Sequence, residues 1–96
     1  MTLHLVTASP FSSPALEQCL AQLGDKDGIL LLEDGVYALN APSWQRRLNA
    51  LNQPVYVLQS DCLARGMGES PALFHSVDMA SVVELTLEYN NSLTWT

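Results

Sequence analysis

The feature that most constrains the fold of this chain is a run of four apolar residues, Ile-Leu-Leu-Leu, at positions 29–32. The run does not alternate between apolar and polar side chains, so it predicts a strand that is covered on both of its faces. Turn-forming residues at 25–28 precede the run, and Glu33, Asp34 and Gly35 end it abruptly. Buried strands of this kind are typical of parallel sheets that lie between layers of helices.

Shorter segments on both sides of this run predict strands that alternate with helices. The first helix should begin behind a Ser13 cap, with Pro14 at its first helical position. Ser60 and Asp61 should cap a short helical turn, which Gly66 closes. We expect further strands at residues 3–7, 55–58 and 74–77, helices at residues 14–23, 43–51, 60–64 and 79–89, and a loop at residues 67–72.

This alternation predicts an α/β fold in which a single small domain spans residues 1–96. Its centre should be a mostly parallel open sheet of about four strands, with helices on both faces. Folds of this kind place their sites just beyond the carboxyl ends of the strands. In this chain those ends are residues 7–9, 33–35 and 60–62.

The composition excludes several classes of protein. The residues are 48% hydrophobic and 15% charged, which favours a folded protein with apolar surface left over for a partner. The formal net charge is −6, so the chain repels phosphates, and Arg46 with Arg47 is interpreted as a solvated helix face. No apolar run approaches the roughly 20 residues that cross a bilayer, and the N-terminus lacks the features of a secretory signal. We therefore expect a cytoplasmic protein with Cys19 and Cys62 as free thiols.

Motifs for common cofactors and metals do not occur in the sequence. It has no Gly-rich phosphate loop, no paired-cysteine zinc spacing and no nucleophile elbow. We therefore expect neither a cofactor nor a metal. His4 and His75 are far apart in the chain, and each is interpreted as a hydrogen-bonded packing residue rather than a ligand.

Three charged residues have two interpretations each. Glu33 and Asp34 are adjacent carboxylates at the end of a buried strand, where one of them could act as an acid or base. The interpretation that we favour is that they cap the next turn or pair with a basic residue. Arg65 likewise either binds an anion or, as we prefer, pairs with a nearby carboxylate.

The two cysteines are the candidate reactive groups. Cys19 shares one helical stripe with three leucines, where it either packs as a small hydrophobe or acts as a thiol. The helix dipole stabilises a thiolate only in the first turn of a helix. Cys19 lies about six residues into its helix, so the dipole does not activate it. Cys62 lies near the start of a helical turn, where backbone amide groups could lower its pKa, although Asp61 opposes this effect. The interpretation that we favour for Cys62 is a packed cysteine.

Several segments together resemble the TusB/DsrH family. The most specific is Leu-Leu-Glu-Asp-Gly-Val-Tyr at residues 31–37, which is followed at the family's distance by Asp-x-x-Ala-Arg-Gly at residues 61–66. Ser-Pro-Phe at residues 9–11, Val-Tyr-Val-Leu at residues 55–58 and the terminal Trp95 are also similar, so the resemblance covers nearly the whole chain.

The resemblance implies a DsrE/F/H-like fold and a subunit that joins TusC-like and TusD-like partners in a dimer of heterotrimers. In that family the assembly passes sulfur as a cysteine persulfide from TusA-type donors towards a TusE-type carrier. The endpoint is 2-thiouridine at the wobble position of tRNA, whereas the DsrEFH counterpart serves dissimilatory sulfur oxidation. The principal catalytic cysteine belongs to the D-type or E-type subunit.

Resemblance and local electrostatics favour different cysteines of this chain. DsrH-type members carry a cysteine in the first helix, and residues 16–20, which include Cys19, are similar to that segment. We choose Cys19 as a secondary persulfide acceptor over Cys62, since a partner subunit could supply the missing activation. Two alternatives stay open: an independent thiol enzyme that uses either cysteine, and a scaffold subunit that carries no sulfur.

Overall fold

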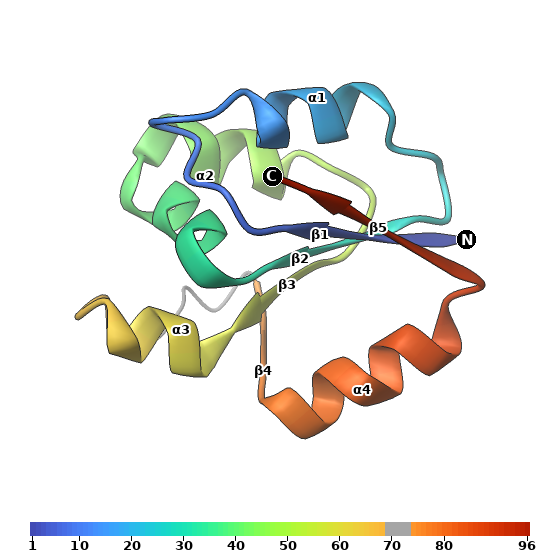
Figure 1. The fold of residues 1–96 in the computed structure, drawn as a ribbon. Coiled ribbons are helices and arrows are strands. Elements are labelled where there is room, and N and C mark those ends of the chain that lie inside the picture. Colours follow the sequence, from blue (N-terminus) through green and yellow to red (C-terminus); the bar gives the residue numbers. More distant parts are fainter. Residues whose placement is uncertain (69–73) are drawn as a thin grey trace.

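The computed structural model describes residues 1–68 and 74–96, and in this part of the chain five strands form one sheet (Figure 1). The order across the sheet is β4-β3-β2-β1-β5, and each neighbouring pair is parallel. The predicted α/β class with a parallel sheet is therefore confirmed. The strands are β1 (Thr2–Val6), β2 (Gly28–Leu31), β3 (Val55–Leu58), β4 (His75–Val77) and β5 (Asn91–Trp95).

Strand β2 is buried along its whole length, as its apolar run predicts. Ile29 and Leu31 belong to the core on one face of the sheet, and Leu30 belongs to the core on the other face. Because β1 and β3 flank β2 on either side, no edge of this strand is left open to water.

Helices cover both faces of the sheet, again as predicted. Figure 1 shows α1 (Ala15–Ala21), α2 (Pro42–Asn49) and the coil of the 3-10 helix η1 (Glu33–Asn40) on one side of the sheet, and α4 (Met79–Glu88) on the other. The short helix α3 (Gln59–Ala64) follows directly after β3. Within the described ranges, none of these helices has the length and hydropathy of a membrane-spanning segment.

Strand β5 was not predicted, and it raises the number of strands in the described residues to five from the expected four or so. It lies at the edge of the sheet, pairs only with β1, and exposes all of its residues except the half-buried Trp95. Such a strand contributes few side chains to the core. Its sequence therefore carries little of the apolar pattern from which strands are predicted.

The start of α1 differs from the prediction by one residue. Pro14 is the N-cap of the helix rather than its first helical residue. Ser13 does act as an acceptor there, because its Oγ receives a hydrogen bond from the N–H of Ala15 at 3.2 Å. The helix ends at Ala21, two residues before the predicted end.

The start of α3 differs in its capping residue. Leu58 is the N-cap, and no side chain caps the helix, so the predicted capping by Ser60 and Asp61 is wrong. Gly66 follows the helix with a φ of +69°, which agrees with its predicted closing role. The predicted loop at residues 67–72 lies outside the described residues from position 69 onward.

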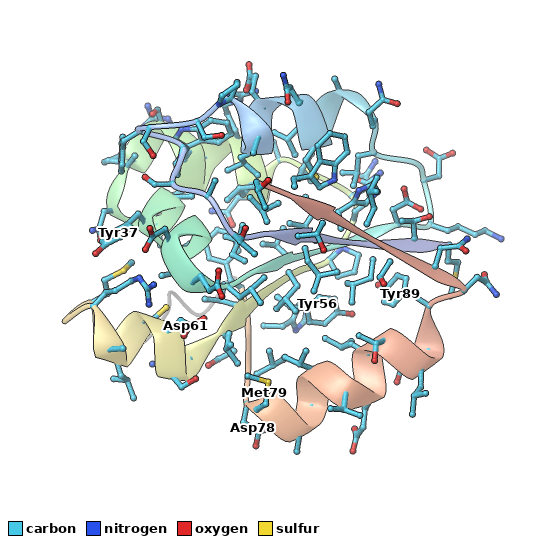
Figure 2. All side chains as sticks on the ribbon, viewed as in Figure 1. Tyr37, Tyr56, Asp61, Asp78, Met79 and Tyr89 are labelled. Carbon is cyan, nitrogen blue, oxygen red and sulfur yellow. The ribbon has the colours of Figure 1, made fainter. Side chains whose placement is uncertain are left out.

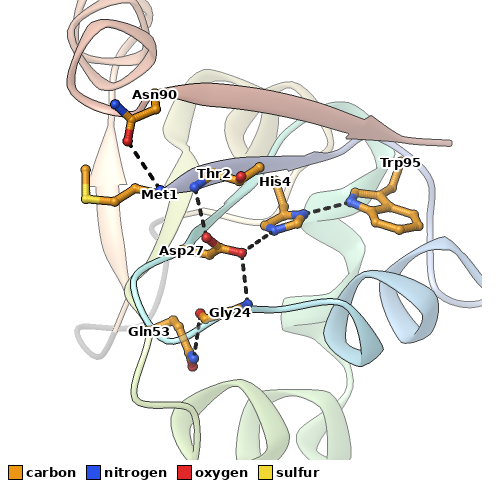
Figure 3. A network of polar contacts seen from close by, with 8 residues as sticks. All are labelled: Met1, Thr2, His4, Gly24, Asp27, Gln53, Asn90 and Trp95. Carbon is orange, nitrogen blue, oxygen red and sulfur yellow. Dashed lines mark hydrogen bonds and ion pairs between the residues drawn. The ribbon is translucent and has the colours of Figure 1, made fainter.

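The carboxylate of Asp27 joins the first strand to the turn before β2 (Figure 3). Its Oδ1 accepts a hydrogen bond from the N–H of Thr2, and its Oδ2 accepts one from the N–H of Gly24, both at 2.9 Å. Oδ2 also lies 2.9 Å from Nε2 of His4, whose side chain is buried. One carboxylate thus holds the start of β1 against the turn that leads into β2.

Trp95 extends this network to the C-terminal strand. Its indole Nε1–H donates to Nδ1 of His4 at 3.0 Å. Because an indole N–H can only donate, Nδ1 of His4 must accept this hydrogen bond, and the imidazole is neutral. Its proton is therefore on Nε2, which donates a hydrogen bond to Oδ2 of Asp27. His4 is therefore a hydrogen-bonded packing residue, as predicted. His75 is instead exposed, and its ring lies 5.4 Å from that of Tyr56.

The network makes the contribution of Asp27 to stability depend on pH. Burial raises the pKa of this carboxyl, but hydrogen bonds from His4, Gly24 and Thr2 together outweigh burial and lower the pKa from 3.8 to about 2. A folded-state pKa below the unfolded value favours the folded state at pH values above the unfolded pKa. The contribution is therefore complete above about pH 4 and is lost as the pH falls towards 2.

We expect Asp27→Ala to lower the free energy of unfolding at neutral pH by about 2–3 kcal/mol, since hydrogen bonds to a charged group are lost. The difference from the wild type should shrink as the pH falls through the range between the two pKa values. Urea unfolding followed by circular dichroism at a fixed protein concentration measures both effects. Asp25→Ala removes an exposed carboxylate from the same turn and is the matched control. An equal loss in the two variants would contradict the prediction.

Candidate functional site

Charged side chains meet at the carboxyl ends of β2 and β3, where the sequence predicted a site. Glu33 begins η1 with a φ of +51°, a left-handed conformation that non-glycine residues rarely adopt. Its N–H donates to Oδ2 of Asp61 at 2.5 Å. In Figure 2, Asp61 lies on α3, below Tyr37 of η1. Asp61 therefore caps the backbone of a different element rather than its own helix.

Arg65 connects the same two elements through its guanidinium group. Its Nε and Nη2 lie 3.0 and 2.9 Å from Oδ1 of Asp34, and its Nη1 donates to the carbonyl oxygen of Asp61 at 3.3 Å. The guanidinium also lies 6.0 Å from the ring centroid of Tyr37. The hydrogen bond to Asp34 raises the pKa of Arg65 and keeps it charged. The preferred interpretation of Arg65 as a partner of a local carboxylate is confirmed.

Gly35 explains why η1 can turn so closely against β1. A Cβ atom at this position would lie 2.1 Å from the carbonyl oxygen of Val6, a distance that no side chain tolerates. The same carbonyl accepts a hydrogen bond from the N–H of Leu32 at 3.2 Å. The Glu-Asp-Gly motif therefore has a structural reason: glycine allows the close approach, and the two acidic residues are fixed by contacts with α3.

Cys19 is fully buried in the core on the α1 side of the sheet. Burial, followed by the negative charge of Asp27, raises the pKa of its thiol from 9.0 to about 12. Leu16 is buried beside it, and Leu20 and Leu23 pack against the same core, so the predicted apolar stripe is confirmed. In the isolated chain Cys19 is a packed, protonated thiol.

Cys62 is also buried, and it belongs to the same core as Cys19. Burial raises the pKa of its thiol, Asp61 raises it further, and Arg65 only partly opposes them. The structure therefore agrees with the favoured interpretation of Cys62 as a packed cysteine, and the lowered pKa that helical amide groups could have given is not found. The reason is that Cys62 is buried, so that desolvation disfavours its thiolate.

Two surface hollows of the described residues have neither thiol in their lining. One, of about 340 Å³, lies where α2 ends and β3 begins, and is lined by residues such as Leu51, Pro54 and Phe74. Another, of about 380 Å³, lies between α1 and β5, and is lined by residues such as Leu93 and Trp95. No group of three His, Cys, Asp or Glu side chains in residues 1–68 and 74–96 could hold a metal ion.

The sequence analysis missed the contact between Asp61 and Glu33 and the network around Asp27. Apart from the contact between Gly24 and Asp27, which is three positions long, these contacts join residues that are 23 to 91 positions apart, and no local pattern signals them. From the sequence, Asp27 was interpreted only as a turn residue, and Trp95 only as part of the family resemblance. The one available signal was the presence of two family motifs at residues 31–37 and 61–66, which contact each other in the structure: Arg65 pairs with Asp34, and Asp61 accepts the N–H of Glu33.

Comparison with known proteins places the whole chain in one family. The family model described as DsrH like protein matches residues 8–92. A relative named Protein TusB from Pectobacterium parmentieri is 36% identical and covers 97% of this chain and 99% of its own length. Protein TusB from Escherichia coli O81 is 35% identical, and that from Yersinia pestis is 34% identical, with the same coverage of both chains.

Solved structures share the fold. The crystal structure of the ychN protein from E. coli has a TM-score of 0.77, at 18% sequence identity and 97% coverage of both chains. The solution structure of protein Tm0979 from Thermotoga maritima has a TM-score of 0.67, at 24% identity, and covers 92% of this chain and 93% of its own. With a family match over residues 8–92 and relatives above 30% identity along nearly the full length, the chain belongs to the DsrH-like family.

Proposed function

We propose that this chain is a non-autonomous subunit of a sulfur-relay complex that passes sulfur as a cysteine persulfide. The observation that carries the proposal is the match to the DsrH-like family and to TusB proteins over nearly the whole chain. The pathway that we favour is the formation of 2-thiouridine at the wobble position of tRNA in the cytoplasm. A DsrH-type role in dissimilatory sulfur oxidation is the alternative pathway.

The burial of both thiols supports the view that the main catalytic cysteine is on a partner subunit. A thiol with a pKa of about 12 is ionised in only about one molecule in 100,000 at neutral pH, and the thiolate is the form that attacks a persulfide. The second thiol is buried as well. An independent thiol enzyme would need an accessible, partly ionised cysteine, so the isolated chain is poorly suited to that function.

The proposed partners are TusC-like and TusD-like subunits in a dimer of heterotrimers, with TusA-like and TusE-like carriers reached through the complex. Exposed apolar side chains in several parts of the fold support association with other proteins. A scaffold subunit without a reactive thiol of its own is the second candidate. It is favoured by the complete burial of Cys19.

The first test concerns assembly. We expect the isolated chain to be poorly behaved or self-associated and to become stable when it is coexpressed with both partners, because obligate interfaces bury on the order of 2,000 Å² or more. Analytical ultracentrifugation of the chain alone and of the coexpressed proteins measures this. A stable monomer that forms no complex with either partner would count decisively against the proposal.

The second test concerns RNA. The chain alone should not bind tRNA at physiological salt, since its net charge is −6, and Arg47 and Arg65 are already paired with Glu17 and Asp34. Fluorescence anisotropy with labelled tRNA measures binding, and an Arg46→Ala, Arg47→Ala double variant should give the same flat curve. A micromolar or tighter dissociation constant that weakens steeply with added salt would overturn this expectation.

We propose further that Cys19 is a secondary sulfur acceptor only within the assembled complex. Transfer requires the Cys19 thiolate to attack the outer sulfur of a donor persulfide, so that a new S–S bond forms and the donor leaves as a thiolate. The exchange needs no oxidant or reductant. A partner subunit must therefore expose and activate Cys19, because the fold of the isolated chain does neither.

The third test follows from this requirement. The complex is incubated with a persulfidated donor, and mass spectrometry locates the added sulfur in the wild type, Cys19→Ser and Cys62→Ser. We expect an adduct of one sulfur on Cys19 and slower, but not abolished, transfer in Cys19→Ser. If no adduct forms on Cys19 and Cys19→Ser transfers at the wild-type rate, the scaffold function is correct. An adduct on Cys62 would reassign the acceptor.

A further inference from the structure

The outer side of α4 carries an apolar stripe that the fold leaves uncovered. Met79, Val83 and Leu87 are 60%, 56% and 81% exposed, and their spacing of four residues aligns them along one side of the helix. The inner side of the same helix, with Val82 and Leu85, is buried against the sheet. Exposed apolar side chains scattered singly are ordinary, but three in a row along one helix mark an interaction surface.

Carboxylates without ion-pair partners lie beside this stripe. Glu84 and Glu88 each follow a stripe residue, so they are one helical turn apart along one flank. Within residues 1–68 and 74–96 neither of them forms a salt bridge, and α4 has no basic residue. The basic side chains of the chain all belong to other segments: Lys26, Arg46, Arg47 and Arg65.

The negative charges of Glu84 and Glu88 limit which kind of surface can bind to the stripe. An antiparallel pair of α4 helices from two copies of this chain would bring their acidic flanks to the same side, where like charges repel, and each copy carries a net charge of −6. An anionic membrane surface would be repelled for the same reason. A surface with an apolar centre and a basic rim satisfies both the stripe and the two glutamates.

We propose that the outer face of α4 docks an amphipathic helix of a different subunit, with apolar residues at its centre and lysine or arginine along one flank. The inference rests on the proposed function, because the partner is a subunit of the same sulfur-relay complex. The three apolar side chains form the centre of the contact, and Glu84 and Glu88 set its orientation and oppose antiparallel pairing with a second copy of this chain, whose net charge is also −6.

The test uses the complex of this chain with its TusC-like and TusD-like partners, captured through a tag on a partner. Leu87→Glu places a charge on the most exposed residue of the stripe and should lower the amount of this chain retained at least tenfold. Glu84→Lys with Glu88→Lys should lower retention several-fold, with a smaller loss at high salt. Lys26→Glu reverses the charge of an exposed turn residue and leaves the apolar surface untouched, so it should leave retention unchanged. Circular dichroism of each variant checks that the fold is kept.

The possible results separate this inference from the proposed function. If the wild-type chain is retained and Leu87→Glu is retained equally well, the complex exists but α4 is not the docking surface. If the wild-type chain itself is not retained, the proposed function fails and the inference fails with it. If Leu87→Glu abolishes self-association of the isolated chain and leaves the complex intact, a second copy covers the stripe, which also overturns the inference.

Discussion

The hydrogen bonds of the Asp27 carboxylate hold the N-terminal and C-terminal strands of the sheet in place. The carboxylate accepts hydrogen bonds from the start of β1 and from the turn before β2, and it orients His4 so that Trp95 can donate to the other ring nitrogen. These contacts hold the edge strand β5 beside β1. Because β5 buries few side chains, a polar network secures it where the inner strands rely on apolar packing.

The same architecture divides the molecule into two unequal sides. On one side α1, α2 and η1 close over a core that contains both cysteines. The other side is covered mainly by α4, whose outer face is apolar and flanked by acidic residues. The chain thus hides its own reactive groups and exposes surface suited to another protein. This combination fits a subunit that works within an assembly better than an enzyme that works alone.

Much of the fold could be predicted because its inner elements have strong local patterns. The apolar run of β2, the β-branched and aromatic residues of β3 and the apolar stripe of α1 all lie in the structure close to where they were expected. The edge strand β5 and the 3-10 helix η1 were missed, since one is mostly polar and the other is held by contacts with distant residues. The acidic and basic residues of the site were predicted individually, and their pairing was preferred over catalysis. Which carboxylate binds which donor required the structure.

The alternation of strands and helices, the acidic charge and the motifs that indicate the family can be read from the amino-acid sequence, because each depends on residues close together in the chain or on simple composition. The roles of Asp61, Trp95 and Cys62 became known from the folded structure. Asp61 caps Glu33 rather than α3, Trp95 completes the Asp27 network, and Cys62 has a raised pKa rather than a lowered one. Hydrogen-bond partners and desolvation depend on which distant residues fold against one another, and no local pattern contains that information.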